Sequence, residues 1–277
     1  YLGAIAAFNA YEPRFDQLRI GDNQPPVSYA IAAEVAGGRV KFAYLSPDFA
    51  NPTGETLTQA ERLAVLDVAE ALNCAVIEDA AYQALRYEGE PVAPILALEQ
   101  ARKGGDLEAC RTIYCGTFSK TLSPGLRVGW VVAASPVIAQ LVLMKQAADL
   151  HSATLNQIAT HQVAAALYES HTATLRAVYG RRRDAMLRAL EQHMPAGVSW
   201  VRPEGGMFVW LTLPTGQDGA ALLQRALAQE QVAFVPGQAF FADGSGANTL
   251  RLSFSNSSET QIAEGVARLG RILSEAQ

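Results

Sequence analysis

The alternation of strand-like and helix-like segments in the first half of the chain most strongly limits its fold. Residues 39–46 (RVKFAYLS) predict a strand, and residues 57–73 predict an amphipathic helix. Residues 74–79 (CAVIED) predict a second strand, and residues 112–118 and 127–133 predict two more. Strands separated by helices favour a mostly parallel, doubly wound sheet, so the expected fold class is α/β.

The second half has a different pattern. Residues 152–194 are helical in pattern, and residues 197–214 predict a β-hairpin with Gly205-Gly206 at its turn. A helix at residues 218–230 and two short strands at 232–237 and 249–255 are expected next. A final helix then completes an α+β unit.

We expect the domain change to fall inside the long helical stretch. Residues 1–170 would form a large domain with a sheet that is incomplete at its N-terminus, and residues 171–277 a small α+β domain. Capping signals support the helices of the large domain. Thr58 and Glu61 have the spacing of a capping box, and Pro136 stands near the start of another helix.

Composition excludes several classes of function. The chain has 277 residues with 49% hydrophobic and 18% charged residues, as in ordinary globular proteins. Its net charge of -5 does not favour a nucleic-acid partner, and no apolar stretch reaches membrane-spanning length. The three cysteines and four histidines lack metal-ligand spacing, so we expect no metal site and a cytoplasmic, reducing location.

Polar clusters follow three of the predicted strands: SPDFANPTG at residues 46–54, EDAAY at 78–82 and GTFSK at 116–120. Ligands of open α/β sheets bind outside the carboxyl ends of the strands, so the three clusters predict one site. Lys120 lies in the turn between two buried strands, where desolvating a free ammonium is costly. A lysine in this place calls for a functional explanation.

Each residue of these clusters also has an ordinary structural explanation. Asp79 could cap a helix, residues 51–54 (NPTG) could form only a turn, and Tyr82 could be a core residue. Arg127 and Arg251 could form surface ion pairs. The functional interpretation therefore depends on their occurrence together.

Five stretches, in this order, resemble the class I/II aminotransferases of the aspartate aminotransferase superfamily, which use pyridoxal 5′-phosphate (PLP) and have fold type I. They are SPDFANPTGETLT, VIEDAAYQALRY, GTFSKTLSPGLRVGW, RPEGGMFVW and NTLRLSFS. The stretch around Lys120 and the opening YLGAIAAF are most similar to the 2-aminoadipate/kynurenine aminotransferase branch.

The resemblance implies a role for each residue around the cofactor ring. Lys120 would form a Schiff base with the cofactor aldehyde and later move a proton between substrate and cofactor. Asp79 would pair with the protonated pyridine nitrogen. Asn51 and Tyr82 would hydrogen-bond the ring's phenolate oxygen, and Asn51 would also border the substrate. Tyr1 would stack on the ring.

The resemblance also assigns the anion-binding groups. Arg127 would bind the cofactor phosphate, with hydroxyls from Thr117 and Ser119; the family usually has serine where Thr117 stands. Arg251 would bind the substrate α-carboxylate as a planar fork. Residues 205–208 (GGMF) would line the pocket from the small domain.

The family carries a long segment before the position that matches Tyr1. It includes an N-terminal arm and a Gly/Ser-rich phosphate-binding loop at a helix start. We therefore expect this chain to be N-terminally truncated relative to the family, to bind PLP weakly and turn over poorly by itself, and to expose apolar surface.

The expected activity is transfer of an α-amino group from an amino acid to a 2-oxo acid, with 2-oxoglutarate as acceptor and a homodimer as the intact assembly. The donor stays open among 2-aminoadipate, kynurenine, aromatic and branched-chain amino acids. Three alternatives stay open too: another PLP reaction such as β-elimination or decarboxylation, the effector domain of a helix-turn-helix transcription regulator, and a non-catalytic α/β domain.

Overall fold

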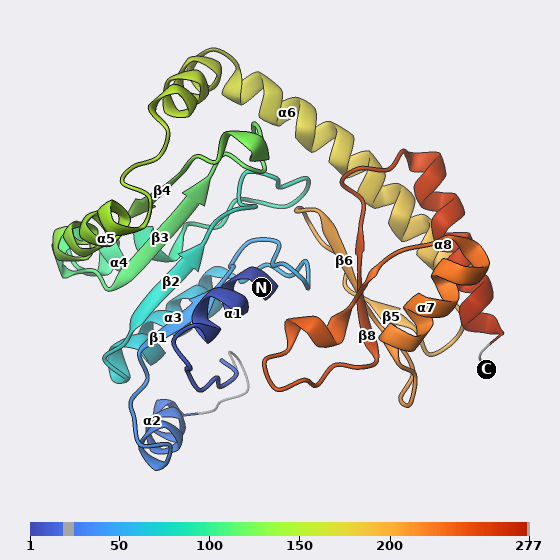
Figure 1. The fold of residues 1–277 in the computed structure, drawn as a ribbon, viewed down its shortest axis with the longest axis horizontal. Coiled ribbons are helices and arrows are strands. Elements are labelled where there is room, and N and C mark those ends of the chain that lie inside the picture. The colour runs from blue at the N-terminus through green and yellow to red at the C-terminus, as the bar shows by residue number, and fades with distance from the viewer. Residues whose placement is uncertain (19–24, 276–277) are drawn as a thin grey trace.

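Two four-stranded sheets are connected by one long helix in the computed structural model, which describes residues 1–18 and 25–275 (Figure 1). The first sheet has the order β1-β2-β3-β4. Its strands are β1 (Phe42–Leu45), β2 (Ala75–Asp79), β3 (Thr112–Thr117) and β4 (Gly129–Val132). β1, β2 and β3 are parallel, whereas β4 is antiparallel to β3 because their short connection holds no crossover helix.

One face of the first sheet is covered by α3 (Gln59–Ala71) and α4 (Ile95–Arg102). Buried apolar side chains from these helices and β2 form a shared core there. The predicted capping box of Thr58 and Glu61 is present at the start of α3. The N-cap of α4 is Pro94, which offers no side-chain acceptor, and Glu78 of β2 accepts from the Ile95 and Leu96 N–H groups instead, at 2.8 and 2.9 Å.

The opposite face of this sheet carries α1 (Leu2–Asn9). The Phe8 ring packs edge-on against Phe42 and Tyr44, with centroid distances of 5.0 and 5.6 Å. Because side chains alternate along a strand, this face also receives Ile77 and Asp79 of β2. α2 (Pro26–Val35) follows α1 in the chain.

α5 (Ser135–Ala148) and α6 (Thr154–His193) follow β4, and Pro136 stands in the first turn of α5 as predicted. α6 is one continuous helix of 40 residues that runs from the first sheet to the second (Figure 1). The short 3₁₀ helices are η1 (Leu107–Ala109), η2 (Pro124–Leu126) and η3 (Gly237–Phe240). The predicted domain change near residue 171 falls within α6, so the division at 170/171 remains a proposal.

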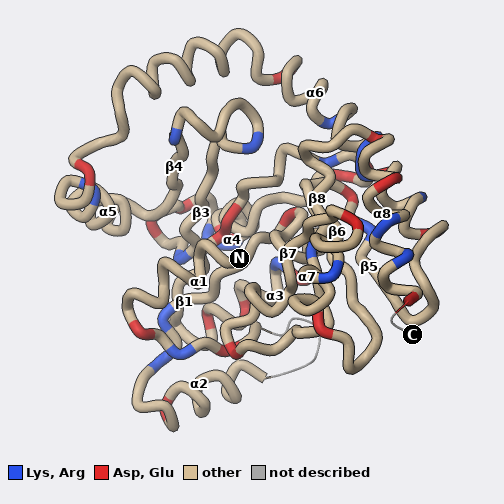
Figure 2. The backbone as a smooth tube through the Cα atoms, turned by 45° about the vertical axis from the view of Figure 1, so that its right-hand side comes forward, with Lys and Arg blue, Asp and Glu red and all other residues tan. Residues whose placement is uncertain are grey.

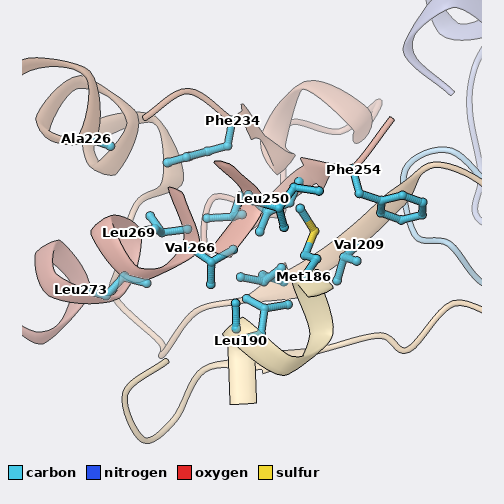
Figure 3. Close-up of a cluster of buried hydrophobic side chains, with 14 of the residues drawn as sticks. Met186, Leu190, Val209, Ala226, Phe234, Leu250, Phe254, Val266, Leu269 and Leu273 are labelled. Atoms are coloured by element: carbon cyan, nitrogen blue, oxygen red, sulfur yellow. The ribbon is translucent and has the colours of Figure 1, made fainter. Parts of the chain in front are cut away.

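The second sheet is antiparallel and has the order β5-β6-β8-β7. Its strands are β5 (Ser199–Trp200), β6 (Phe208–Thr212), β7 (Val235–Pro236) and β8 (Thr249–Ser253). α7 (Gly219–Glu230), α8 (Glu259–Ser274) and the end of α6 pack on it. Together they bury a cluster that includes Met186, Leu190, Val209 and Leu250 (Figure 3).

Apolar side chains are exposed on β4, α5 and the first half of α6. They include Val132, Leu143, Leu155 and Ile158, with the Leu155 side chain 76% exposed. The first turns of α6 carry no charged side chain (Figure 2). Among the described residues, no helix combines the length and apolarity that crossing a membrane requires.

Candidate functional site

The candidate site lies at the carboxyl ends of β1, β2 and β3. Asp79 is the last residue of β2, Thr117 is the last residue of β3, and Asn51 follows β1 in a turn. Lys120 lies in the turn between β3 and β4, as the sequence predicts. The topology therefore brings the three polar clusters to one edge of the sheet.

A cavity of about 400 Å³ opens on the α1 face of the sheet, and Asp79 lies on its wall. Tyr1, Phe8, Tyr44 and Thr117 also line it. The two carboxylate oxygens of Asp79 accept hydrogen bonds from different donors: Oδ2 from the Tyr44 hydroxyl at 2.6 Å and Oδ1 from the Ala81 N–H at 3.2 Å. The cavity thus has a fixed carboxylate in a wall that also carries three aromatic rings.

Tyr82 is buried between the two halves of the chain. Its ring lies 5.9 Å from Phe208 of β6, and Lys120 Nζ lies 5.8 Å from its centroid. Burial, followed by the charge of Asp79, raises the pKa of Tyr82 to about 12. The Tyr82 phenol is therefore neutral at physiological pH and can donate a hydrogen bond.

Arg251 of β8 reaches from the second sheet to the loop after β1. Its Nη1 donates to Asn51 Oδ1 at 2.5 Å, and its guanidinium lies 4.0 and 5.0 Å from the ring centroids of Phe208 and Phe240. Burial lowers the pKa of Arg251, but a guanidinium stays protonated in proteins. Within the described chain its Nε is buried without a hydrogen-bond partner, so the side chain keeps a free donor for an anion.

The connection between β3 and β4 gathers the residues predicted to hold a phosphate. Thr117 Oγ1 lies 2.9 Å from Ser119 Oγ and accepts from the Ser119 N–H at 3.1 Å. Arg127 has a left-handed backbone conformation with φ of 55°, is exposed, and donates to the Pro124 carbonyl at 3.2 Å. Within the described residues, Arg127 and Asp79 share no hydrogen bond.

Gly205 and Gly206 do more than form a turn. Gly205 pairs with Arg86 in an isolated β-bridge, and the Gly206 N–H donates to the Leu85 carbonyl at 2.9 Å. A Cβ on Gly205 would lie 2.3 Å from that carbonyl oxygen and 2.5 Å from the Phe49 ring. Turn geometry alone is therefore an incomplete explanation of this pair, because close packing against the first half of the chain also requires glycine.

Two features of the site were missed by sequence reasoning. One is the Tyr44 hydroxyl on Asp79, which the two-residue alternation of β1 could have suggested once its register with β2 was known. The other is the buried ion pair of Asp48 and Arg62 at 2.7 Å, to which Arg86 adds a second cation at 3.5 Å. No local pattern in the sequence pairs these charges.

Comparison with solved structures gives the fold class. The chain superposes on the α-aminoadipate aminotransferase LysN of Thermus thermophilus with a TM-score of 0.87 and 41% identity, over 99% of this chain and 69% of that one. That structure was solved with N-(5′-phosphopyridoxyl)-L-leucine. The architecture is that of the fold type I PLP enzymes.

The sequence comparisons give the family. Residues 47–269 match the profile of Aminotransferase class I and II, and the chain belongs to this family. It is 42% identical over 280 residues to aromatic-amino-acid aminotransferase 1 of Thermococcus litoralis, covering 99% of this chain and 65% of that protein. It is 44% identical over 273 residues to 2-aminoadipate transaminase of Thermus thermophilus, covering 99% and 67%.

A more distant relative is a helix-turn-helix-type transcriptional regulator of Bacillus subtilis, 33% identical over 231 residues, with 82% of this chain and 45% of the regulator covered. The chain spans about two thirds of the length of the two aminotransferases above. The resemblance to this family predicted from the five sequence stretches is confirmed.

The cofactor of this family is pyridoxal 5′-phosphate, and the residues present fit it. A carboxylate on the cavity wall suits a protonated pyridine nitrogen, and the hydroxyls of Thr117 and Ser119 suit a phosphate. The unpartnered Nε of Arg251 suits the carboxylate of a substrate held beside the cofactor.

Proposed function

We propose that this chain supplies the cofactor-binding and substrate-binding residues of an aminotransferase that moves an α-amino group from an amino acid to a 2-oxo acid. The observation that carries the proposal is the position of Lys120 and Arg251 around one pair of rings. Lys120 Nζ lies by the Tyr82 ring, and Arg251 lies over the Phe208 ring that packs against Tyr82. A nucleophilic amine and a carboxylate-binding cation are the two groups that amino-acid chemistry needs close together.

Lys120 is proposed to carry the cofactor as a Schiff base between its Nζ and the cofactor aldehyde. The Lys120 amine, once free, would accept the proton of the substrate α-carbon as a general base. When bound, PLP supplies an electron sink for the carbanion at that carbon. Lys120 is half-buried at the carboxyl end of β3, with its Nζ 5.8 Å from the centroid of the Tyr82 ring, which places the amine at the edge of the sheet where the cofactor is proposed to bind.

Asp79 is proposed to hold the proton on the ring nitrogen, and Asn51 and Tyr82 to hydrogen-bond the ring's phenolate oxygen. The neutral Tyr82 phenol is suited to donating to that oxygen. Tyr1, on the cavity wall opposite the sheet, is proposed to stack on the ring.

Thr117, Ser119 and Arg127 are proposed to bind the cofactor phosphate. Arg251 is proposed to bind the substrate α-carboxylate, with Asn51 keeping its guanidinium in place through the 2.5 Å hydrogen bond.

The acceptor is proposed to be 2-oxoglutarate, and the intact protein a cytoplasmic homodimer with domains at 1–170 and 171–277. Relatives named for 2-aminoadipate and for aromatic amino acids both match this chain at similar identity. We therefore propose the amino donor only as a class, an α-amino acid that is bound through its carboxylate.

An effector domain of a transcription regulator is the second candidate, favoured by the match to the Bacillus subtilis regulator. The two candidates differ in turnover. A regulator domain would bind the cofactor through Lys120 without passing the amino group to a 2-oxo acid, whereas an aminotransferase completes both half-reactions.

Absorption spectroscopy with added PLP tests the proposal. The protein should show a visible band that Lys120→Ala removes and that Lys145→Ala retains, since Lys145 pairs with Asp149 on the surface of α5. An amino acid should bleach the band and a 2-oxo acid should restore it. A band unaffected by Lys120→Ala would refute the proposal, and bleaching without restoration would favour a lyase or a regulator.

A further inference from the structure

Asp79 is held from two sides. Its Oδ1 accepts the Ala81 N–H at 3.2 Å, a backbone contact within its own turn. Its Oδ2 accepts the Tyr44 hydroxyl at 2.6 Å, a contact from the neighbouring strand. An O–H···O distance in this range is typical of a hydrogen bond to an ionised carboxylate.

We propose that Tyr44 is a positioning residue for Asp79: its hydroxyl fixes the orientation of the carboxylate toward the cofactor ring. The inference rests on the proposed function, because it concerns the partner of the ring nitrogen. Tyr44 itself acts through Asp79 and needs no contact with the cofactor.

Strand register explains why Tyr44 reaches Asp79. Tyr44 of β1 pairs with Ile77 of β2, so its side chain lies on the same face as Ile77 and Asp79. Both Tyr44 and Asp79 line the 400 Å³ cavity. Phe8 of α1 packs edge-on against the Tyr44 ring, with the centroids 5.6 Å apart, and this contact restricts the ring.

Two donors leave the carboxylate able to accept more. An ionised carboxylate has room for about four hydrogen bonds, and the two observed donors take two of them. The remaining acceptor capacity faces the cavity with its direction set by the Tyr44 and Ala81 contacts. Without the phenol, Asp79 would keep a single donor and could rotate about its terminal torsion.

The phenol is a permanent donor. Burial, and then the charge of Asp79, raise the pKa of Tyr44 well above its ordinary value. The Tyr44 hydroxyl therefore stays protonated at physiological pH and remains available as a donor to Asp79. This hydrogen bond keeps the carboxylate in the orientation that a ring N–H requires.

Tyr44→Phe isolates the hydroxyl, because the ring and its contact with Phe8 remain. Tyr114→Phe is the matched control: Tyr114 is a half-buried tyrosine of β3 whose hydroxyl donates to Gln83 at 2.9 Å and does not contact Asp79. Each variant is made alone and together with Asp79→Asn. PLP affinity is measured by titration of the absorption band, and thermal melts check folding.

Tyr44→Phe should raise the Kd for PLP about tenfold, as expected when a hydrogen bond to a charged group is lost, whereas Tyr114→Phe should change it less than twofold. In the Asp79→Asn background, Tyr44→Phe should have less than a twofold effect. An unchanged Kd in Tyr44→Phe would overturn the proposal. So would a tenfold loss that persists in the Asp79→Asn background, because Tyr44 would then act on something else.

A second measurement keeps the test valid if Tyr44→Phe folds less stably than the parent protein. After loading with saturating PLP and removal of the unbound cofactor, the ratio of visible to near-ultraviolet absorption reports only folded, loaded molecules, and Tyr44→Phe should lower it. An unchanged ratio would overturn the proposal. Failure of the proposed function is seen separately, as a visible band that survives Lys120→Ala in the parent protein.

Discussion

Arg251 and Asn51 are joined by a 2.5 Å hydrogen bond between residues 200 positions apart in the sequence. Asn51 follows β1 of the first sheet, and Arg251 belongs to β8 of the second. The bond therefore couples the relative position of the two sheets to the direction of a cation that is suited to a substrate carboxylate. Phe208 and Phe240 hold the same guanidinium by ring contacts.

The Asn51–Arg251 bond predicts how substrate binding responds to mutation. Arg251→Lys should raise the KM for amino acid and 2-oxo acid alike by about 10- to 100-fold, because lysine cannot form a planar fork. Asn51→Ala should raise KM by a smaller factor and also weaken PLP binding.

Steady-state kinetics measures both effects. Arg271→Lys is the control, since Arg271 forms an exposed pair with Glu230 at 2.7 Å. A normal KM in Arg251→Lys would contradict the assignment of this residue to the substrate carboxylate.

The buried pair of Asp48 and Arg62 predicts a large effect on stability. The Arg62 side chain is fully buried, and Asp48→Asn would leave its charge without a full partner. The free energy of unfolding should fall by about 3–5 kcal/mol, the range seen when one member of a buried pair is removed. Urea unfolding measures the change.

The exposed pair of Arg181 and Glu259 is the comparison for that variant. Its members are 60% and 48% exposed, so Glu259→Gln should cost less than about 1 kcal/mol. Equal losses in Asp48→Asn and Glu259→Gln would contradict the interpretation of Asp48 as a buried counter-ion.

Gly206 and Gly265 predict opposite results for the same substitution. Gly206 has φ of +76°, and a Cβ there would lie 2.5 Å from Phe49 Cβ, so Gly206→Ala should destabilise the protein by at least about 1–3 kcal/mol. Gly265 lies inside α8 with open space around it, so Gly265→Ala should stabilise by about 0.5–1 kcal/mol. Denaturant midpoints at equal m-values give both numbers.

The raised pKa of Tyr82 predicts an alkaline loss of stability. The unfolded phenol ionises near its ordinary pKa of about 10, whereas the folded pKa is about 12. The contribution of Tyr82 is fully present below pH 10 and falls as pH rises toward 12. Between pH 9 and 11.5, the free energy of unfolding of the cofactor-free protein should therefore fall by up to about 2 kcal/mol more than that of the Tyr82→Phe variant. Equal decreases in the free energy of unfolding of the two proteins would contradict the raised pKa of Tyr82.

Much of the architecture could be predicted because its causes are local. The β-branched segments, the capping box of Thr58 and Glu61, and the turn that holds Lys120 all depend on neighbouring residues. The direction of β4 depends on how its connection crosses the sheet. The Tyr44–Asp79 contact depends on the register between β1 and β2.

The functional site, too, could be predicted from the sequence only in part. The residue types at Asn51, Asp79, Lys120 and Arg251 follow from the chemistry that the family resemblance implies. The contact of Gly205 with Leu85 and Phe49 could not be predicted, because it joins segments more than a hundred residues apart along the chain. Their meeting depends on how the two sheets pack.

The attachment of the cofactor to Lys120 is tested most directly by borohydride reduction of the PLP-loaded protein, followed by peptide mass spectrometry. The chain holds four lysines, Lys41, Lys103, Lys120 and Lys145. Lys103 and Lys145 pair with Glu70 and Asp149 at the surface. We predict one phosphopyridoxyl group per chain, on the peptide that contains Lys120. A stoichiometric label on any other lysine, or none on Lys120, would contradict the proposed function.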